Sequence, residues 1–210
     1  MAAAPEARPV LESGDRLTRE EFHRRYCRRP DIRKAELVRG VVYVASPTRT
    51  DMHADPVGLV AFWLNAYRIR VPGLRVAVDG TVFLSPDSEL QPDVFLYWQP
   101  ARGSGARLND EGYIEGAPEL VVEVAASSAS YDLHDKMEAY RLAGVPEYIV
   151  WLALDKQILW FRLRDGDYVR VEPDAEGVIV SEQFPGLRLN VPALLAGDAA
   201  GVLAALSTQP

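Results

Sequence analysis

The sequence predicts an α/β fold in which a mixed central β-sheet is flanked by helices and by β-hairpins. Three observations support this fold class. Apolar, β-branched segments alternate with helical segments, two hairpin patterns flank them, and the stretch from Pro118 to Trp151 has the order strand, helix, strand. Such a crossover is right-handed and joins parallel strands in nearly all known cases.

The first half of the chain is predicted to contain a helix, a hairpin and a second helix, over residues 19–26, 35–45 and 51–67. Thr18 and Glu21 form a capping-box pattern at the start of the first helix. A two-residue Arg-Gly turn joins the β-branched runs AELV and VVYVA, as in a hairpin. Apolar residues then recur at helical spacing until the Pro72-Gly73 pair stops the pattern.

The second half continues with strands, a helix, a further strand, a hairpin and a last short helix. The expected ranges are 74–78, 92–98 and 118–126 for the strands, 132–143 for the helix, 146–153 for the next strand, 156–173 for the hairpin and 192–206 for the final helix. Gly144 is a natural stop for the helix that precedes it. The sequence DGD supplies the turn of the hairpin.

The length of 210 residues fits one domain. We expect residues 1–15 to be a mobile tail, residues 16–190 to form the domain, and residues 191–210 to form a C-terminal helix and tail. The N-terminus lacks a signal-peptide pattern, and no apolar stretch approaches the ~20 residues needed to span a bilayer. Cys27 is the only cysteine, which excludes an internal disulfide. A soluble, cytoplasmic protein is therefore expected.

The formal charge of −7 argues against the whole chain being a nucleic-acid binder, because phosphate contacts require Lys and Arg. The stretch from Arg16 to Arg39 is nevertheless strongly basic. Two interpretations remain open for it: a solvated helix face with a loop, or an edge that faces phosphates.

Two acidic residues stand inside apolar strand sequence. Glu123 lies in the run ELVVEVAA, where an unpaired buried carboxylate would cost several kcal/mol. Asp93 opens the strand PDVFLYW. If these strands pair, the two carboxylates converge, and converging carboxylates repel each other unless a cation lies between them. Mg²⁺ or Mn²⁺ suits such oxygen ligands. The alternatives are that Glu123 belongs to a wet face with Glu119, and that Asp93 only forms a turn.

Lys136 lies on the helix after the Glu123 strand, four residues from both Asp132 and Tyr140. Because this helix packs back over the sheet, Lys136 can approach Glu123. A lysine beside a metal-bound phosphate orients or activates water and stabilises developing negative charge. The alternative is an exposed surface lysine.

Three further residues are weaker candidates for the same site. Glu36 either completes the acidic cluster or pairs with Arg39. His53 stands near a helix start, where a packing or helix-start role is an alternative to a role as ligand, and Gln91 is a candidate polar neighbour of a metal ion.

These residues form an ordered set that resembles a known family. The strings are ELVRG (36–40), His53, QPDV (91–94), PELVVEVAASS (118–128), D-x-x-x-K (132–136) and YRLAGVPEYIVW (140–151). They resemble the Uma-two family of restriction-endonuclease-like proteins, within the PD-(D/E)xK nuclease superfamily. The resemblance covers roughly residues 18–190.

The resemblance implies a restriction-endonuclease-like sheet and a Mg²⁺-dependent site that cleaves phosphodiester bonds of nucleic acid, with DNA as the expected partner. Asp93, Glu123 and the backbone carbonyl of Val124 would then hold the metal, and Glu36 would be an additional acid. The superfamily's usual lysine position, two residues after the second acid, is Ala125 here. Lys136 on the following helix fits the displaced lysine.

Three function classes follow from these residues. The first is a metal-dependent endonuclease, for which a two-fold dimer would supply two symmetric sites for cutting a duplex. The second is a nuclease-fold protein that binds nucleic acid or a protein partner without cutting. The third, a two-carboxylate glycoside hydrolase, would need a row of aromatic sugar subsites. The sequence lacks such a row, although four aromatic residues keep this class open: Tyr97, Trp98, Trp151 and Trp160.

Overall fold

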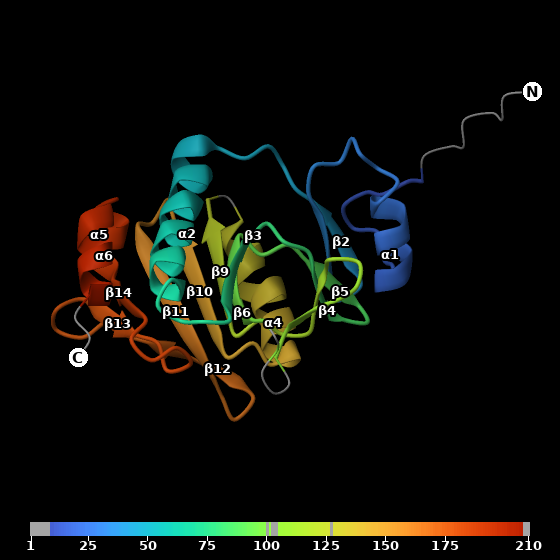
Figure 1. Ribbon diagram of the computed structural model, residues 1–210. Coiled ribbons are helices and arrows are strands. Elements are labelled where there is room, and N and C mark those ends of the chain that lie inside the picture. Colours follow the sequence, from blue (N-terminus) through green and yellow to red (C-terminus); the bar gives the residue numbers. More distant parts are fainter. Residues whose placement is uncertain (1–8, 100, 102–104, 127, 208–210) are drawn as a thin grey trace, which may run out of the picture.

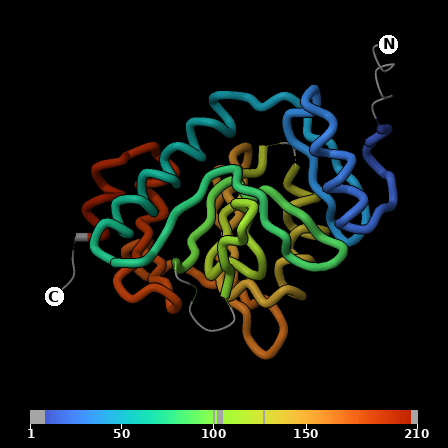
Figure 2. Tube along the Cα trace, turned by 45° about the vertical axis from the view of Figure 1, so that its right-hand side comes forward, coloured from blue at the N-terminus to red at the C-terminus, as the bar shows by residue number. Residues whose placement is uncertain are grey.

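The computed structural model describes residues 9–99, 101, 105–126 and 128–207, and it contains two six-stranded mixed sheets flanked by helices. The first has the strand order β2-β1-β5-β4-β8-β7 and the second the order β12-β11-β10-β9-β6-β3. Figure 1 shows α1 at one end of the molecule and α5 with α6 at the other, and Figure 2 shows the same separation from a second direction. The expected α/β class with a mixed, helix-flanked sheet is confirmed.

The first sheet, here called sheet A, is built from short strands. Their bounds are β1 Ala35–Val38, β2 Val41–Val44, β4 Val82–Ser85, β5 Ser88–Leu90, β7 Arg107–Leu108 and β8 Ile114–Glu115. The predicted hairpin is confirmed in β1 and β2, where Arg39 and Gly40 both have positive φ, as a type I′ turn requires. The other four strands of sheet A were not predicted.

The second sheet, sheet B, contains the strands that the sequence predicted, together with the second hairpin. Their bounds are β3 Leu74–Val78, β6 Val94–Trp98, β9 Leu120–Ala125, β10 Glu147–Leu152, β11 Gln157–Arg164 and β12 Asp167–Val171. Strands β9 and β10 pair in parallel, as expected for the crossover, and β6 pairs antiparallel with β9. A separate small ladder joins β13 Val178–Val180 to β14 Arg188–Asn190.

Helices cover both faces of sheet B, and α1 packs against sheet A. Their bounds are α1 Arg19–Tyr26, α2 Asp55–Arg68, α3 Ala129–Tyr131, α4 Met137–Ala143, α5 Val191–Leu195 and α6 Ala199–Ser207, with π-helical turns η1 Thr50–Ala54 and η2 Asp132–Lys136. The predicted final helix is divided into α5 and α6. No helix within the described ranges is long and apolar enough to cross a membrane.

Two apolar cores lie on opposite faces of sheet B. One contains Val122 and Val124 of β9 with Trp63 of α2 and residues of α5 and α6. The other contains Val121 and Ala125 of β9, and it extends to α4 and to sheet A. Alternate residues of β9 therefore enter different cores, because successive strand side chains point to opposite faces.

Part of the N-terminal segment packs against the first hairpin. Residues 1–8 of the expected tail lie outside the described residues. Beyond them, Leu11 is buried in a third small core with Phe22, and Gly14 and Asp15 form backbone hydrogen bonds with Val42 of β2. The segment 11–15 thus packs along the first hairpin.

Candidate functional site

Asp93, directly before β6, and Glu123 in β9 lie opposite each other on the same face of sheet B. Val94 lies opposite Val122 in the β6–β9 register, so the next pair along these antiparallel strands is Asp93 with Glu123. This face points toward α4 and sheet A, because Glu123 lies on the same side of β9 as Val121 and Ala125, which belong to that core. Both acids are almost fully buried, at 3% and 2% exposure. The predicted convergence of the two strands is confirmed, and the wet-face alternative is wrong.

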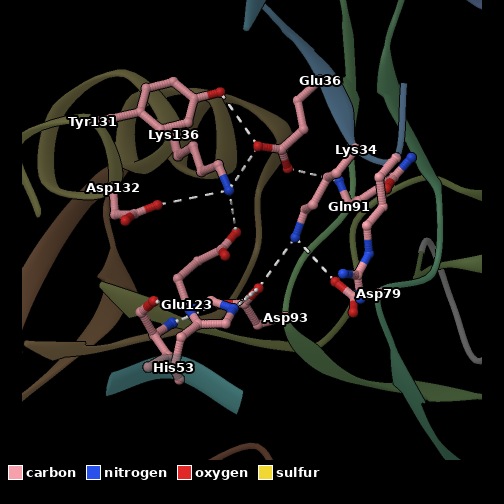
Figure 3. Close-up of polar contacts among 12 residues, drawn as sticks. Lys34, Glu36, His53, Asp79, Gln91, Asp93, Glu123, Tyr131, Asp132 and Lys136 are labelled. Carbon is pink, nitrogen blue, oxygen red and sulfur yellow. Dashed lines mark hydrogen bonds and ion pairs between the residues drawn. The ribbon is translucent and has the colours of Figure 1, made fainter. Parts of the chain in front are cut away.

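Lys136 lies at the centre of a cluster of carboxylates, shown in Figure 3. Its ammonium group donates a hydrogen bond to Glu123 Oε1 at 3.0 Å and forms ion pairs with Glu36 Oε2 at 2.9 Å and Asp132 Oδ1 at 3.6 Å. Tyr140, one turn further along, donates its hydroxyl to the same Glu123 oxygen at 2.7 Å. The surface-lysine alternative is wrong, because Lys136 is only 4% exposed.

A π-helical turn delivers Lys136 to this position. The predicted helix over 132–143 begins earlier, at Ala129, and contains the turn η2 from Asp132 to Lys136 before it continues as α4. A second π-helical turn, η1, carries His53 at the start of α2. Such turns are rare and often occur at functional sites. Here both of them supply side chains to one cluster.

Asp93 is held by groups from three other segments. Its Oδ2 accepts the backbone N–H of Val124 at 2.8 Å, while Oδ1 lies 3.1 Å from Lys34 Nζ and 3.3 Å from His53 Nε2. The other ring nitrogen of His53 donates to the Val124 carbonyl at 2.8 Å. Lys34 also contacts Asp79 at 3.0 Å. His53 therefore lies in the site, beside both groups expected to hold a metal.

The electrostatic environment shifts the pKa values of Asp93 and Glu123 in opposite directions. Burial alone would raise the pKa of Asp93, but the hydrogen bond from His53 and the charge of Lys34 outweigh it and hold that pKa well below its usual range. Burial raises the pKa of Glu123, and the attraction of Lys136 does not compensate for it and for the neighbouring carboxylates. The pKa of His53 is raised, chiefly by its hydrogen bond to Asp93.

The donor set suits a hard divalent cation. Among the described residues, four buried carboxylates are in ion-pair contact with two ammonium groups, those of Lys34 and Lys136, and the acids are Glu36, Asp93, Glu123 and Asp132. Oxygen ligands with excess negative charge are what Mg²⁺ and Mn²⁺ prefer. Within the described residues, no three His, Cys, Asp or Glu side chains are arranged as a ready metal cluster. The two lysines instead contact the carboxylate oxygens.

The remaining predicted residues take different positions. Glu36 pairs with Lys136 and not with Arg39, which is exposed in the hairpin turn. Gln91 donates its backbone N–H to Glu36 Oε1 at 2.8 Å, while its side-chain amide bonds to the Tyr26 hydroxyl at 3.2 Å. Gln91 thus orients Glu36 through its backbone.

Lys34 is the main site residue that sequence reasoning missed. It stands directly before β1 and two positions before Glu36, so the two side chains point to the same side of the chain. That spacing was the available signal, but the surrounding basic stretch made a solvated position the natural interpretation. Other basic residues of that stretch are solvent-exposed, among them Arg24, which pairs with Glu21 on α1.

The candidate aromatic residues pack in the two cores, with Trp98 partly buried against the first of them. Trp160 is fully buried in one core, and Trp151 is 7% exposed in the same core. Tyr97 is 9% exposed in the other. With these rings committed to packing, the glycoside-hydrolase interpretation loses its support.

Comparison with known proteins relates the chain to one family and to solved structures. The model of the family Uma2, described as "Putative restriction endonuclease", matches residues 19–192. A crystal structure described as a putative nuclease belonging to DUF820, from Anabaena variabilis ATCC 29413, aligns with a TM-score of 0.61 and 15% identity, over 78% of this chain and 90% of that chain. At this identity the structural likeness shows the fold alone. No curated protein matches the chain.

Proposed function

Because this chain belongs to the Uma2 family of putative restriction endonucleases, we propose that it is a Mg²⁺-dependent endonuclease that hydrolyses phosphodiester bonds of DNA. The observation that carries the proposal is the meeting of Asp93 and Glu123 on one buried face, with Lys136 in hydrogen-bond contact with Glu123. Mn²⁺ is the expected substitute for Mg²⁺.

Asp93, Glu123 and the backbone carbonyl of Val124 are the proposed metal ligands. A carbonyl oxygen has two lone pairs, so Val124 can accept the hydrogen bond of His53 and still serve as a ligand. His53 and the Val124 N–H fix the orientation of Asp93 from two sides. When bound, a divalent ion would polarise the phosphate and lower the pKa of an attacking water.

Lys136 is proposed to act as a fixed positive charge and hydrogen-bond donor. Burial alone would lower its pKa, but the carboxylates of Glu123, Glu36 and Asp132 outweigh burial and raise that pKa well above its usual value. In the metal-free protein Lys136 is therefore protonated. Its proposed role is to hold Glu123 in place and to stabilise negative charge that develops on the phosphate.

The proposed nucleic-acid contact surface includes exposed arginines of the basic stretch, such as Arg16 and Arg39. The same part of the chain supplies Lys34 and Glu36 to the site. Phosphate contacts of this kind bind DNA without reading its sequence. Duplex cleavage would further favour a two-fold homodimer with two symmetric sites.

The test is cleavage of plasmid and of short single-stranded DNA with Mg²⁺ or Mn²⁺, with and without a chelator. We expect phosphomonoester and hydroxyl ends, and loss of at least ~100-fold in rate for Asp93→Asn and Glu123→Gln, the scale of removing a group that stabilises transition-state charge. Glu119→Gln is the matched control, because it neutralises another acid near the start of the same strand. Cleavage that survives both site substitutions would exclude the assignment.

One observation favours a second candidate, a nuclease-fold protein that binds without cutting. Each oxygen of Asp93 already has a partner within the chain, so the site is electrostatically supported without metal. Calorimetric titration separates the candidates. A non-catalytic binder takes up no Mn²⁺ at these acids, whereas the proposed enzyme does so in a manner that Glu123→Gln abolishes.

A further inference from the structure

The two lysines of the site differ in how firmly they are held. Lys136 is 4% exposed and is surrounded by three buried carboxylates. The Lys34 side chain is 22% exposed and reaches the site from its edge. One of its two partners, Asp93, is buried, while the other, Asp79, has a side chain that is 63% exposed. Lys34 therefore lies between a buried acid and an exposed one, and Figure 3 shows its contacts with both Asp93 and Asp79.

Lys34 occupies the oxygen of Asp93 that the backbone does not use. Asp93 Oδ2 accepts the Val124 N–H, and Oδ1 faces the Lys34 ammonium group at 3.1 Å and the His53 ring at 3.3 Å. A cation that binds Asp93 through Oδ1 must share this oxygen with a positive charge that is already present. Like charges at such separation repel strongly where water is largely excluded.

We propose that Lys34 is an exchangeable counter-cation of the metal site, which neutralises Asp93 when no divalent ion is bound and competes with that ion for Asp93 Oδ1. The inference rests on the proposed function, since it concerns the same site. Asp79 is the second partner that this exchange requires, because its exposed carboxylate already lies 3.0 Å from the Lys34 ammonium group. The lysine thus keeps an anionic partner when Asp93 is taken.

The physical reason is that a buried carboxylate cannot be left uncompensated. Removing one partner of a buried ion pair leaves a charge without a partner and destabilises the protein. Lys34 prevents this in the metal-free protein, and it does so at the expense of metal affinity. Lys136 cannot play the same part, because its three carboxylates have no other ammonium group within the described residues to replace it.

The test is calorimetric titration of Mn²⁺ into the full chain and into Lys34→Met. We expect Lys34→Met to bind Mn²⁺ more tightly by about fivefold, the change in affinity that corresponds to a partly exposed ion pair near 1 kcal/mol. Its melting temperature without metal should fall. Lys34→Arg restores the charge and should return the dissociation constant toward that of the original chain. Arg33→Met is the control, since it removes one exposed charge at the adjacent position.

Asp79→Asn provides a second test that does not depend on losing Lys34. Without Asp79 the lysine has only Asp93, so displacement should become harder and Mn²⁺ binding weaker. Asp79→Asn also removes a negative charge, which by itself weakens cation binding. The double variant with Lys34→Met separates these causes: under the inference, Asp79→Asn loses most of its effect when Lys34 is absent.

The outcomes distinguish the inference from the proposed function. If the original chain binds Mn²⁺ and Lys34→Met binds it equally well, the inference fails and the enzyme proposal stands. Binding that appears only after Lys34→Met supports the competition. If neither protein takes up Mn²⁺, both proposals fail. An equal gain in Arg33→Met would assign the effect to net charge and contradict a role specific to Lys34.

Discussion

Lys136 is the residue on which the burial of three carboxylates depends. Its ammonium group is in contact with Glu36, Glu123 and Asp132, and none of these acids is more than 6% exposed. We predict that Lys136→Met lowers the free energy of unfolding by about 3–5 kcal/mol, the cost of breaking a buried ion pair from one side. Urea unfolding at neutral pH measures it.

The control for that prediction is Lys156→Met, which removes an exposed lysine from the turn between β10 and β11. It should change the unfolding free energy by no more than about 0.5 kcal/mol, as surface substitutions usually do. Equal stability of Lys136→Met and Lys156→Met would mean that the carboxylates are compensated in another way.

The buried carboxyl group of Glu119 leads us to expect that the free energy of unfolding depends on pH. It is 9% exposed, and its Oε2 is buried without a hydrogen-bond partner. Burial raises its pKa from 4.5 to about 7. Between these pH values the folded protein binds more protons at this position than the unfolded chain, so its contribution to stability is lost as the pH rises.

We therefore predict that Glu119→Gln flattens the decline of unfolding free energy between about pH 4.5 and pH 7, because glutamine does not titrate. Denaturant titrations at several pH values measure the slope for both proteins. Asp93, whose pKa is lowered, titrates below this pH range and therefore does not contribute to the slopes being compared. Identical slopes in both proteins would show that Glu119 is ionised throughout.

At the scale of elements, the turn between α4 and β10 sets where the site helix ends. Gly144 follows α4 with φ 85°, a left-handed conformation that residues with a side chain adopt at a cost. A Cβ atom added there would meet nothing within 4 Å, so the backbone conformation is the only penalty. We predict that Gly144→Ala destabilises the protein by about 1 kcal/mol.

Gly58 provides the matched comparison for this prediction. It lies exposed inside α2, and a Cβ atom there also meets nothing within 4 Å. Because alanine favours helix more than glycine does, Gly58→Ala should stabilise by roughly 0.5–1 kcal/mol. Thermal unfolding of both variants tests the pair, and a shift of the same sign in both would refute the argument from backbone conformation.

Elements with a strong local pattern were predictable, and those without one were not. The β-branched residues around a turn predicted the hairpin of β1 and β2. The apolar runs on either side of a helical segment predicted β9 and β10. Strands β7 and β8 have only two residues each and show no alternation. Sheet A as a whole depends on pairings between distant short segments, which no local pattern encodes.

The same difference in local sequence pattern explains which site residues could be predicted. Asp93 and Glu123 were predictable because acids inside apolar strands are unusual, and Lys136 because it follows Asp132 at helical spacing. Lys34 was not, since a lysine in a basic stretch differs from its neighbours only through a contact with a strand 59 residues away. The π-helical turns depend on packing and carry no sequence signal of their own.

At the scale of the whole molecule, the site lies where the two sheets meet. Sheet A and the residue just before it supply Glu36 and Lys34, while sheet B supplies Glu123, with Asp93 directly before β6. The crossover helix adds Lys136 between them. A ligand bound by these acids would therefore stabilise the arrangement of both sheets.

Because the site lies between the two sheets, we expect a bound metal ion to stabilise both of them against unfolding. Under the proposed function, Mn²⁺ at about 100 times its dissociation constant adds about 2.7 kcal/mol of stability. For a domain of this size that raises the melting temperature by roughly 5–11 °C. All four tryptophans, Trp63, Trp98, Trp151 and Trp160, belong to α2 or sheet B. Their fluorescence therefore reports on that part of the molecule, whereas far-ultraviolet circular dichroism reports on both sheets.

We expect both signals to shift by the same amount with Mn²⁺, since the acids connect the two sheets into one cooperative unit. Glu123→Gln should abolish the shift, and Glu119→Gln, on the same segment but outside the acid cluster, should retain it. If circular dichroism resolves an earlier transition that Mn²⁺ leaves unchanged, sheet A unfolds separately and does not depend on the site. If Mn²⁺ shifts Glu123→Gln as much as the original chain, the ion binds elsewhere, and Asp93 with Glu123 is not the metal centre.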